Sequence, residues 1–282
     1  MTKQLTIAAL ILLITGAGWL YFNTSANTPP AAESKTEKLV LTGSSTIAPL
    51  AAEIGKRFES LNPGVRVDVQ TGGSSRGISD ARAGLADIGM ASRALKDDEK
   101  DLLKFTIALD GISVILNKAN PVKALDKQQI IDIYTGKIVN WKDVGGNDAP
   151  VTVVNKAEGR STLELFLHYF GLKNTQVKPQ VIIGDNQQGI KTVIGNPDAI
   201  GYVSVGTAEY EASQGAAIKL LPLAGIAASV ENVRNRGFPL SRPLNLVTRT
   251  EPVGIAKTFI EFAGSPQVDD LIEAQYFVPV PH

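Results

Sequence analysis

Apolar and polar positions alternate along the chain with two periods, one typical of strands and one typical of helices. Val65, Val67 and Val69 alternate with polar residues, which predicts a half-buried strand. In the preceding segment, apolar residues recur every three or four positions and predict an amphipathic helix: Ile47, Leu50, Ile54, Phe58 and Leu61. Strand-like and helix-like patterns then alternate along most of the chain.

The predicted strands cover residues 39–41, 65–69, 86–93, 105–117 (as two runs broken at Asp110-Gly111), 151–154, 181–183, 200–205, 218–223 and 244–248. The predicted helices cover residues 47–61, 78–83, 97–103, 127–134, 161–170, 187–194, a stretch around 209, 252–263 and 267–274. Strands that alternate with helices predict an α/β fold with largely parallel sheets. The units are too many for one small sheet and are not evenly spaced as in a barrel.

Three turns rich in small hydroxyl residues each precede a predicted helix: Thr42–Pro49, Thr71–Gly77 and Glu158–Thr162. A helix N-terminus carries unpaired N–H groups and partial positive charge, so such a turn can hold an anion. One turn alone is more simply explained as an ordinary N-cap. Three of them together predict a shared anion site.

Composition limits the classes of function. Lys plus Arg and Asp plus Glu balance at 28 each, so no overall charge favours nucleic acid and any anion site must be local. The chain has no cysteine and only His168 and His282, which excludes thiolate or histidine-rich metal sites. A phosphate-ester enzyme is a further hypothesis, but no nucleophile elbow, phosphate-loop lysine or suitable histidine supports it. We therefore predict no catalytic residue, no metal and no cofactor.

The N-terminus is predicted to be a targeting segment. Lys3 precedes an uncharged run from Leu5 to Phe22, whose length lies between a long signal peptide and a minimal membrane span. Residues 1–22 are thus a signal peptide or a membrane anchor, with the anchor favoured, and residues 23–37 a flexible linker. In both cases the rest of the chain is expected to be exported to the periplasm or cell surface. If the segment is an anchor, residues 5–22 would tether the protein to the inner membrane.

Several motifs in one order carry a family resemblance: Leu41–Pro49, Gly73–Gly77, Ala86–Arg93, Asp110–Val114, Tyr134–Trp141 and Ala199–Val203. Together they resemble the phosphate-binding subunits of ABC importers. The resemblance implies a two-domain periplasmic-binding-protein type II (Venus-flytrap) fold with a ligand cleft between the domains, after the N-terminal hydrophobic helix. Binding domain 1 would comprise residues 38–111 plus 221–282, and binding domain 2 residues 112–220.

The resemblance also implies a function and a ligand set. The protein would capture inorganic phosphate as a monomer by inter-domain closure and deliver it to ABC transporter permease subunits, with no nucleic acid involved. The implied ligand-binding residues are Ser45, Thr46, Ile47, Ser74, Ser75, Arg93, Asp110, Arg160, Ser161 and Thr162. The alternatives are an anion sensor or surface adhesin without transport, or a receptor for another oxyanion such as sulfate.

Three positions depart from the family pattern. Arg93 stands where some members have an aspartate that accepts a proton from monohydrogen phosphate, Arg160 replaces a serine, and Lys156 replaces an arginine. The site is thus expected to be more cationic than usual. Without a carboxylate acceptor, discrimination between phosphate and sulfate should weaken, unless Asp110 substitutes. Asp110 could instead be a turn or hinge residue.

Overall fold

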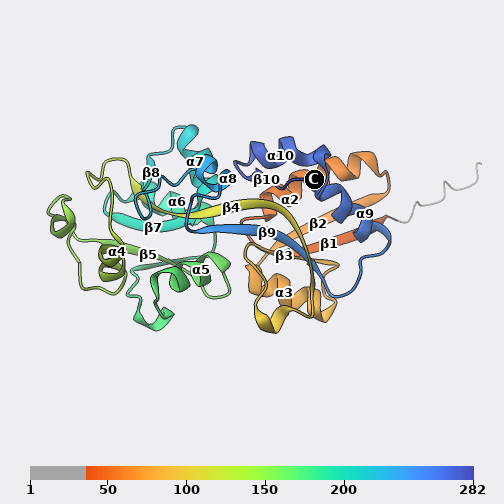
Figure 1. Cartoon of the computed structure of the whole chain (residues 1–282), viewed down its shortest axis with the longest axis horizontal. Helices are drawn as coiled ribbons and strands as arrows, with labels where there is room; N and C mark the ends of the chain where they lie inside the picture. The colour runs from red at the N-terminus through yellow and green to blue at the C-terminus, as the bar shows by residue number, and fades with distance from the viewer. Residues whose placement is uncertain (1–35) are drawn as a thin grey trace, which may run out of the picture. The chain divides into compact units, whose positions relative to one another are not determined.

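The computed structural model describes residues 36–282, and residues Glu37–His282 form one compact unit (Figure 1). The predicted signal peptide or anchor at residues 1–22 lies outside the described residues, as does the linker up to residue 35. From residue 36 onward, no helix is both long and apolar enough to cross a membrane.

Ten strands form one sheet system in the order β2-β1-β3-β9-β4-β7-β5-β6, with β8 and β10 also paired to β4. Their bounds are β1 (Glu37–Gly43), β2 (Val65–Thr71), β3 (Ile88–Ala91), β4 (Leu103–Asn117), β5 (Thr152–Lys156), β6 (Val181–Ile183), β7 (Ala199–Ser204), β8 (Ile218–Leu220), β9 (Ser241–Thr248) and β10 (Val278–Pro279).

The helices fill the intervals between strands, as the sequence pattern predicts. They are α2 (Ala48–Leu61), α3 (Ser74–Ala83), α4 (Lys127–Tyr134), α5 (Ser161–Phe170), α6 (Asn186–Gly195), α7 (Val205–Ser213), α8 (Val230–Arg234), α9 (Gly254–Ala263) and α10 (Asp269–Ala274). Short 3-10 turns occur at η1 (Asp97–Glu99), η2 (Trp141–Val144), η3 (Asn174–Gln176) and η4 (Pro266–Val268). A capping box begins α4, because Asp126 and Gln129 exchange side-chain to backbone hydrogen bonds.

The α/β class is confirmed, but the expectation of largely parallel sheets is wrong at the centre. β1 pairs in parallel with β2 and β3, and β5 in parallel with β6 and β7. β4 and β9 instead pair antiparallel with each other and with their other neighbours. These two strands run side by side in opposite directions, because the chain crosses between the two halves along β4 and returns along β9 (Figure 1).

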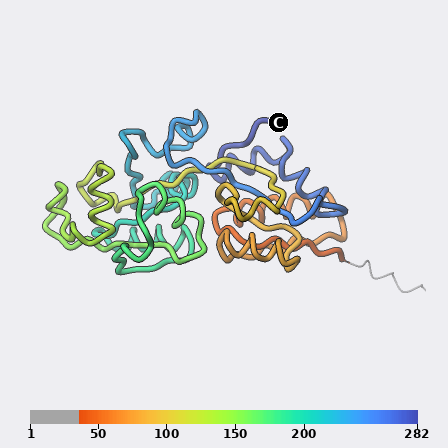
Figure 2. The backbone as a smooth tube through the Cα atoms, turned by 60° about the horizontal axis from the view of Figure 1, so that its bottom comes forward, coloured from red at the N-terminus to blue at the C-terminus, as the bar shows by residue number. Residues whose placement is uncertain are grey.

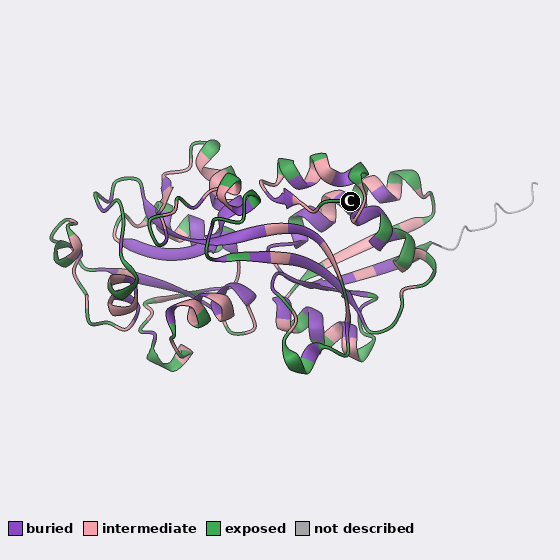
Figure 3. Cartoon of the chain, in the orientation of Figure 1, coloured by how far each residue is buried: buried purple, intermediate pink, exposed green. Residues whose placement is uncertain are grey.

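β4 is one continuous strand, so the predicted break at Asp110-Gly111 is wrong. Asp110 pairs with Arg242 and Gly111 with Ser241 in the β9 ladder. Gly111 fits closely there, since a Cβ at this position would lie 3.0 Å from the side chains of Val205 and Val233 and would require them to shift. The strand therefore passes through the interior, and Figure 3 shows it buried over most of this stretch.

Two large groups of buried apolar side chains lie on either side of the β4–β9 crossing. The first core cluster joins β1, β3 and α2 to the C-terminal helices, where Phe58 packs edge-to-face on Phe259 at 5.2 Å. Figure 2 shows this return of the blue C-terminal segment to the red and orange N-terminal elements. The second core cluster contains Ile112, Phe166 and Tyr202, together with apolar residues of the segment from Leu221 to Leu240.

Candidate functional site

The N-termini of α2, α3 and α5 meet beside the carboxyl ends of β1 and β3. Glycines permit the approach: a Cβ on Gly77 would lie 2.7 Å from the backbone oxygens of Thr42 and Met90. Gly43 has φ 129°, which disfavours any other residue there. Ser74 at the start of α3 is thereby brought next to the end of the sheet. The predicted convergence of the three hydroxyl-rich turns is thus observed.

Six buried hydroxyl side chains gather at this point, and we call them the hydroxyl cluster: Ser44, Thr46, Ser74, Ser92, Ser161 and Thr162. The Oγ of Ser92 lies at their centre. It accepts from Ser44 Oγ at 2.9 Å and lies 2.5 Å from Ser161 Oγ. Since Ser44 and Ser92 belong to the first half of the chain and Ser161 to the middle, the cluster joins segments packed on the two core clusters.

Arg242 on β9 places a guanidinium against the cluster. Its Nη1 donates to Thr162 Oγ1 at 2.9 Å and its Nη2 to Thr46 Oγ1 at 3.3 Å. Its Nε and Nη2 also donate to Asp110 Oδ2, at 3.0 and 2.8 Å. Both side chains are almost fully buried, at 1% and 0% exposed. Each charge of this buried ion pair compensates the other, which offsets the cost of removing both groups from water.

The carboxylate of Asp110 is fully engaged in this structure. Its Oδ1 accepts from Ser204 Oγ at 2.9 Å and from the backbone N–H of Gly206 at 3.1 Å, while Oδ2 accepts from Arg242. Its position on β4, directly opposite Arg242 in the ladder, makes it a residue that positions the guanidinium. A direct contact between Asp110 and a ligand stays a prediction.

Arg93 lies just behind the cluster and is held by carboxylates. Its Nη1 and Nη2 donate to Glu99 at 2.6 and 2.8 Å, and its Nε lies 3.0 Å from Glu164 Oε2 without hydrogen-bond geometry. Burial lowers the pKa of Arg93, but the two carboxylates more than offset this and leave that pKa above its ordinary value. The predicted role of Arg93 as a ligand is not supported by a position in the cavity wall.

A small cavity lies against the hydroxyl cluster. It is lined by Ser44, Ser45, Thr46, Gly73, Ser74, Ser92, Arg160, Ser161 and Thr162. Arg160 precedes α5, and its Nε is buried without a hydrogen-bond partner. A buried cationic donor with no acceptor is costly, and an anion in this cavity would satisfy it.

The remaining predicted ligands have partners within the protein. The Ile47 amide donates to Ser44 Oγ at 3.3 Å, which closes the first turn. Ser75 faces α5, since its Oγ donates to Glu164 Oε1 at 3.0 Å and its amide to the carbonyl of Gly159 at 3.2 Å. These two residues shape the turns, and direct ligand contacts from them stay predictions.

A buried lysine completes the surroundings of the cluster. Lys156 Nζ, on β5, donates to Asn186 Oδ1 at 3.0 Å, and Asn186 Nδ2 donates to Thr46 Oγ1 at 3.2 Å. Burial, reinforced by the charge of Arg242, lowers the pKa of Lys156 to about 7. The ammonium is therefore easily titrated, and a nearby anion would favour its charged form.

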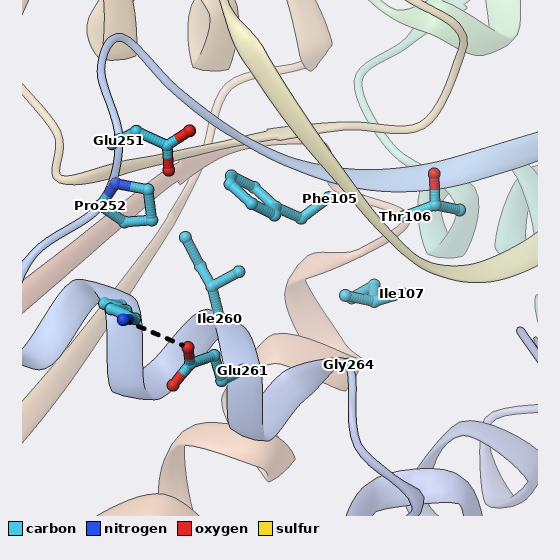
Figure 4. Close-up of a pocket in the computed structure, with 9 residues that line it drawn as sticks. Phe105, Thr106, Ile107, Glu251, Pro252, Ile260, Glu261 and Gly264 are labelled. Carbon is cyan, nitrogen blue, oxygen red and sulfur yellow. Dashed lines mark ion pairs between the residues drawn. The ribbon is translucent and has the colours of Figure 1, made fainter. Parts of the chain in front are cut away.

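Another pocket lies on the first core cluster, away from the hydroxyl cluster (Figure 4). Phe105 and Ile260 line it with apolar side chains, and Glu251 and Glu261 add carboxylates, the latter paired with Lys257 at 3.7 Å. Carboxylates in the lining disfavour an anion. From residue 36 onward, no group of three or more His, Cys, Asp or Glu side chains could hold a metal ion.

Four residues of the site were missed by sequence reasoning: Ser44, Ser92, Asn186 and Arg242. Ser44 and Ser92 had a local signal, because Ser44 lies in the first hydroxyl-rich turn and Ser92 ends a buried strand. Asn186 and Arg242 had none. Arg242 becomes a site residue only through its register opposite Asp110, which lies 132 positions earlier.

Comparisons with known proteins give matches over most of the chain. The phosphate-binding protein PstS of Bacillus subtilis is 27% identical over 98% of this chain and 93% of its own length. A Clostridium perfringens protein, described as a phosphate ABC transporter substrate-binding protein with bound phosphate, is 35% identical, with a TM-score of 0.80 over 87% of this chain and all of its own. An ABC-type phosphate transport receptor of Vibrio cholerae is 30% identical over the same shares, with a TM-score of 0.69. The family model of the PBP superfamily domain matches residues 28–267, and the chain therefore belongs to that family.

Proposed function

We propose that this protein captures inorganic phosphate outside the cytoplasm and delivers it to an ABC importer. The observation that carries the proposal is the small cavity in which hydroxyl groups converge with the unpartnered Nε of Arg160. These are the donors that a tetrahedral oxyanion needs. The relatives described as phosphate-binding and phosphate transport proteins support the choice of phosphate.

Phosphate would be held by closure of two lobes on either side of the β4–β9 crossing. Contacts between segments of the two core clusters support this: Ser92 meets Ser161, and Asn186 meets Thr46. An anion bound between the lobes would favour the closed form by its greater affinity for that form. The apolar residues between Leu221 and Leu240 pack with Ile112, which favours including this segment in the second lobe.

The proposal extends to export and partners. The protein would act as a monomer at the cell surface or in the periplasm, held near the permease by residues 5–22 if that segment remains uncleaved. Binding proteins of this kind need no catalytic group, and the site offers donors and positioning instead of a nucleophile with its base.

Phosphate binding should depend strongly on Arg160. Replacing it by alanine removes the cationic donor of the cavity, and affinity measured by isothermal titration of the full-length protein should fall at least about tenfold, since hydrogen bonds to charged groups contribute roughly 1.5–3 kcal/mol. The matched control is Arg82→Ala, because Arg82 forms an exposed ion pair with Asp101 at 2.6 Å. If the folded wild-type protein gives no heat with phosphate, the proposed function is wrong. If the two variants weaken binding equally, the binding site does not lie at Arg160.

Glu164 should stabilise the closed form without touching the ligand. It lies on α5 and contacts Ser75, Arg93 and Lys96, with Lys96 Nζ 2.9 Å from Oε2. In Glu164→Gln these ion pairs are lost, so phosphate affinity should fall about tenfold while the radius of gyration without ligand rises.

The control for Glu164 is Glu273→Gln, whose partner Arg234 lies 3.5 Å away on an exposed surface. Exposed pairs of this kind contribute little, so binding should be unchanged. Small-angle scattering and titration calorimetry measure both quantities. Wild-type affinity in Glu164→Gln would show that this contact has no part in closure.

A further inference from the structure

The carboxylates nearest to the hydroxyl cluster are all engaged by other groups. Asp110 accepts from Arg242, Ser204 and Gly206 with its two oxygens. Glu99 is held by Arg93, and Glu164 lies against Arg93 and Lys96. Asp185 caps α6 by accepting from Gln188, and it lines an adjacent pocket that also includes Thr46 and Arg160. In the part of the chain from residue 36 onward, none of the residues that line the cavity is a carboxylate.

The cations around the cavity divide into compensated and uncompensated groups. Arg93 is matched by Glu99 and Glu164, and Arg242 is matched by Asp110. Within residues 36–282, Arg160 and Lys156 form no ion pair within 4.0 Å. The charged groups that face this region are, by element, Arg93 after β3, Lys96 and Glu99 at η1, Asp110 on β4, Lys156 on β5, Arg160 and Glu164 at α5, Asp185 before α6 and Arg242 on β9.

We propose that this site selects its ligand by charge and shape and not by protonation, so that it binds doubly charged tetrahedral anions, sulfate as well as the dianion of phosphate. Two cations without an ion pair inside 4.0 Å, Arg160 and the Lys156 ammonium that a bound anion would keep protonated, match two negative charges. This inference rests on the proposed phosphate-binding function. It adds which tetrahedral anions, and which protonation states of phosphate, the site binds.

The lining of the cavity explains why protonation should matter little. A carboxylate would repel an oxygen that carries no proton and would accept from one that does. The hydroxyl cluster behaves differently. Thr46 and Thr162 already accept from Arg242 through Oγ1, so their O–H groups are left to donate, while a hydroxyl without such a donor can rotate to donate or to accept. The cluster therefore satisfies an unprotonated ligand oxygen and requires no proton on the ligand. Anions are then distinguished by the attraction between their negative charge and the cations Arg160 and Lys156.

The test is isothermal titration of the full-length protein with sodium phosphate and sodium sulfate at about pH 8 and about pH 6. At the higher pH, the two dissociation constants should agree within about tenfold. Lowering the pH converts phosphate to its monoanion and leaves sulfate unchanged. The ratio of sulfate affinity to phosphate affinity should therefore rise by about tenfold at the lower pH.

Variants separate this inference from the proposed function. Lys156→Met should weaken sulfate and phosphate dianion alike, while Lys137→Met, which removes an exposed lysine paired with Asp132, should change neither. Phosphate binding with sulfate more than about a hundredfold weaker at the higher pH would overturn the inference and leave phosphate capture standing. Absence of binding by both anions would overturn phosphate capture itself.

Discussion

Replacing Arg242 by methionine is expected to lower the free energy of unfolding by about 3–5 kcal/mol and to abolish phosphate binding. The guanidinium is the buried partner of Asp110 and donates to Thr46 and Thr162. Without it, the Asp110 charge is left uncompensated in the interior and the hydroxyl cluster loses the group that orients it. Urea unfolding gives the first quantity and titration calorimetry the second.

A double variant shows whether Arg242→Met destabilises the protein by leaving the Asp110 charge uncompensated or by losing packing contacts. Asp110→Asn combined with Arg242→Met removes both charges, so it should be more stable than Arg242→Met alone. It should still fail to bind phosphate, because the donor to the hydroxyl cluster is absent. If the double variant is less stable than either single one, the pair is not held together by its charges.

Lys156→Met is expected to stabilise the ligand-free protein in a pH-dependent manner. Above the ordinary lysine pKa of 10.5, both the folded and the unfolded protein carry a neutral lysine, so the native residue costs nothing through its charge. Between that value and the folded pKa of about 7, only the unfolded protein binds the proton, and native stability falls as the pH is lowered. The advantage of methionine should grow over this window to at most roughly 5 kcal/mol and then level off.

Thermal and urea unfolding across this pH range measure the effect, with Lys137→Met as the exposed control. Saturating phosphate should shrink the advantage of Lys156→Met, because a bound anion stabilises the charged lysine. A stability difference that does not vary with pH would mean that the Lys156 ammonium is solvated in the folded protein.

Local patterns were enough to predict the three turns that form the site. Each turn combines a strand end, small hydroxyl residues and the start of an amphipathic helix, and all three signals lie within about ten residues. The turns bring Thr46, Ser74, Ser161 and Thr162 to the wall of the cavity, and ligand contacts from these four residues stay predictions. The fold class followed from the same alternation of periods.

The charge network could not be predicted in the same way. Arg93 carries a local signal for a cleft residue, but its guanidinium turns toward Glu99 and Glu164. The second of these comes from a helix that follows a long intervening stretch of chain. Asp110 and Gly111 look like a turn in sequence, and only the partner strand β9 makes them part of a continuous ladder. Long-range pairing decided these positions, and no short window contains it.

The long pairing of β4 with β9 has a mechanical consequence. Residues Leu103–Gly111 are bonded to Ser241–Thr248 with one irregularity, between Thr106 and Ala108. A ribbon of two hydrogen-bonded strands bends and twists as one elastic element, unlike a loop that swivels freely about a few bonds. Movement of one lobe against the other would therefore bend this pair of strands elastically. The restoring force of the bent strands would then help to set how quickly a captured anion is released.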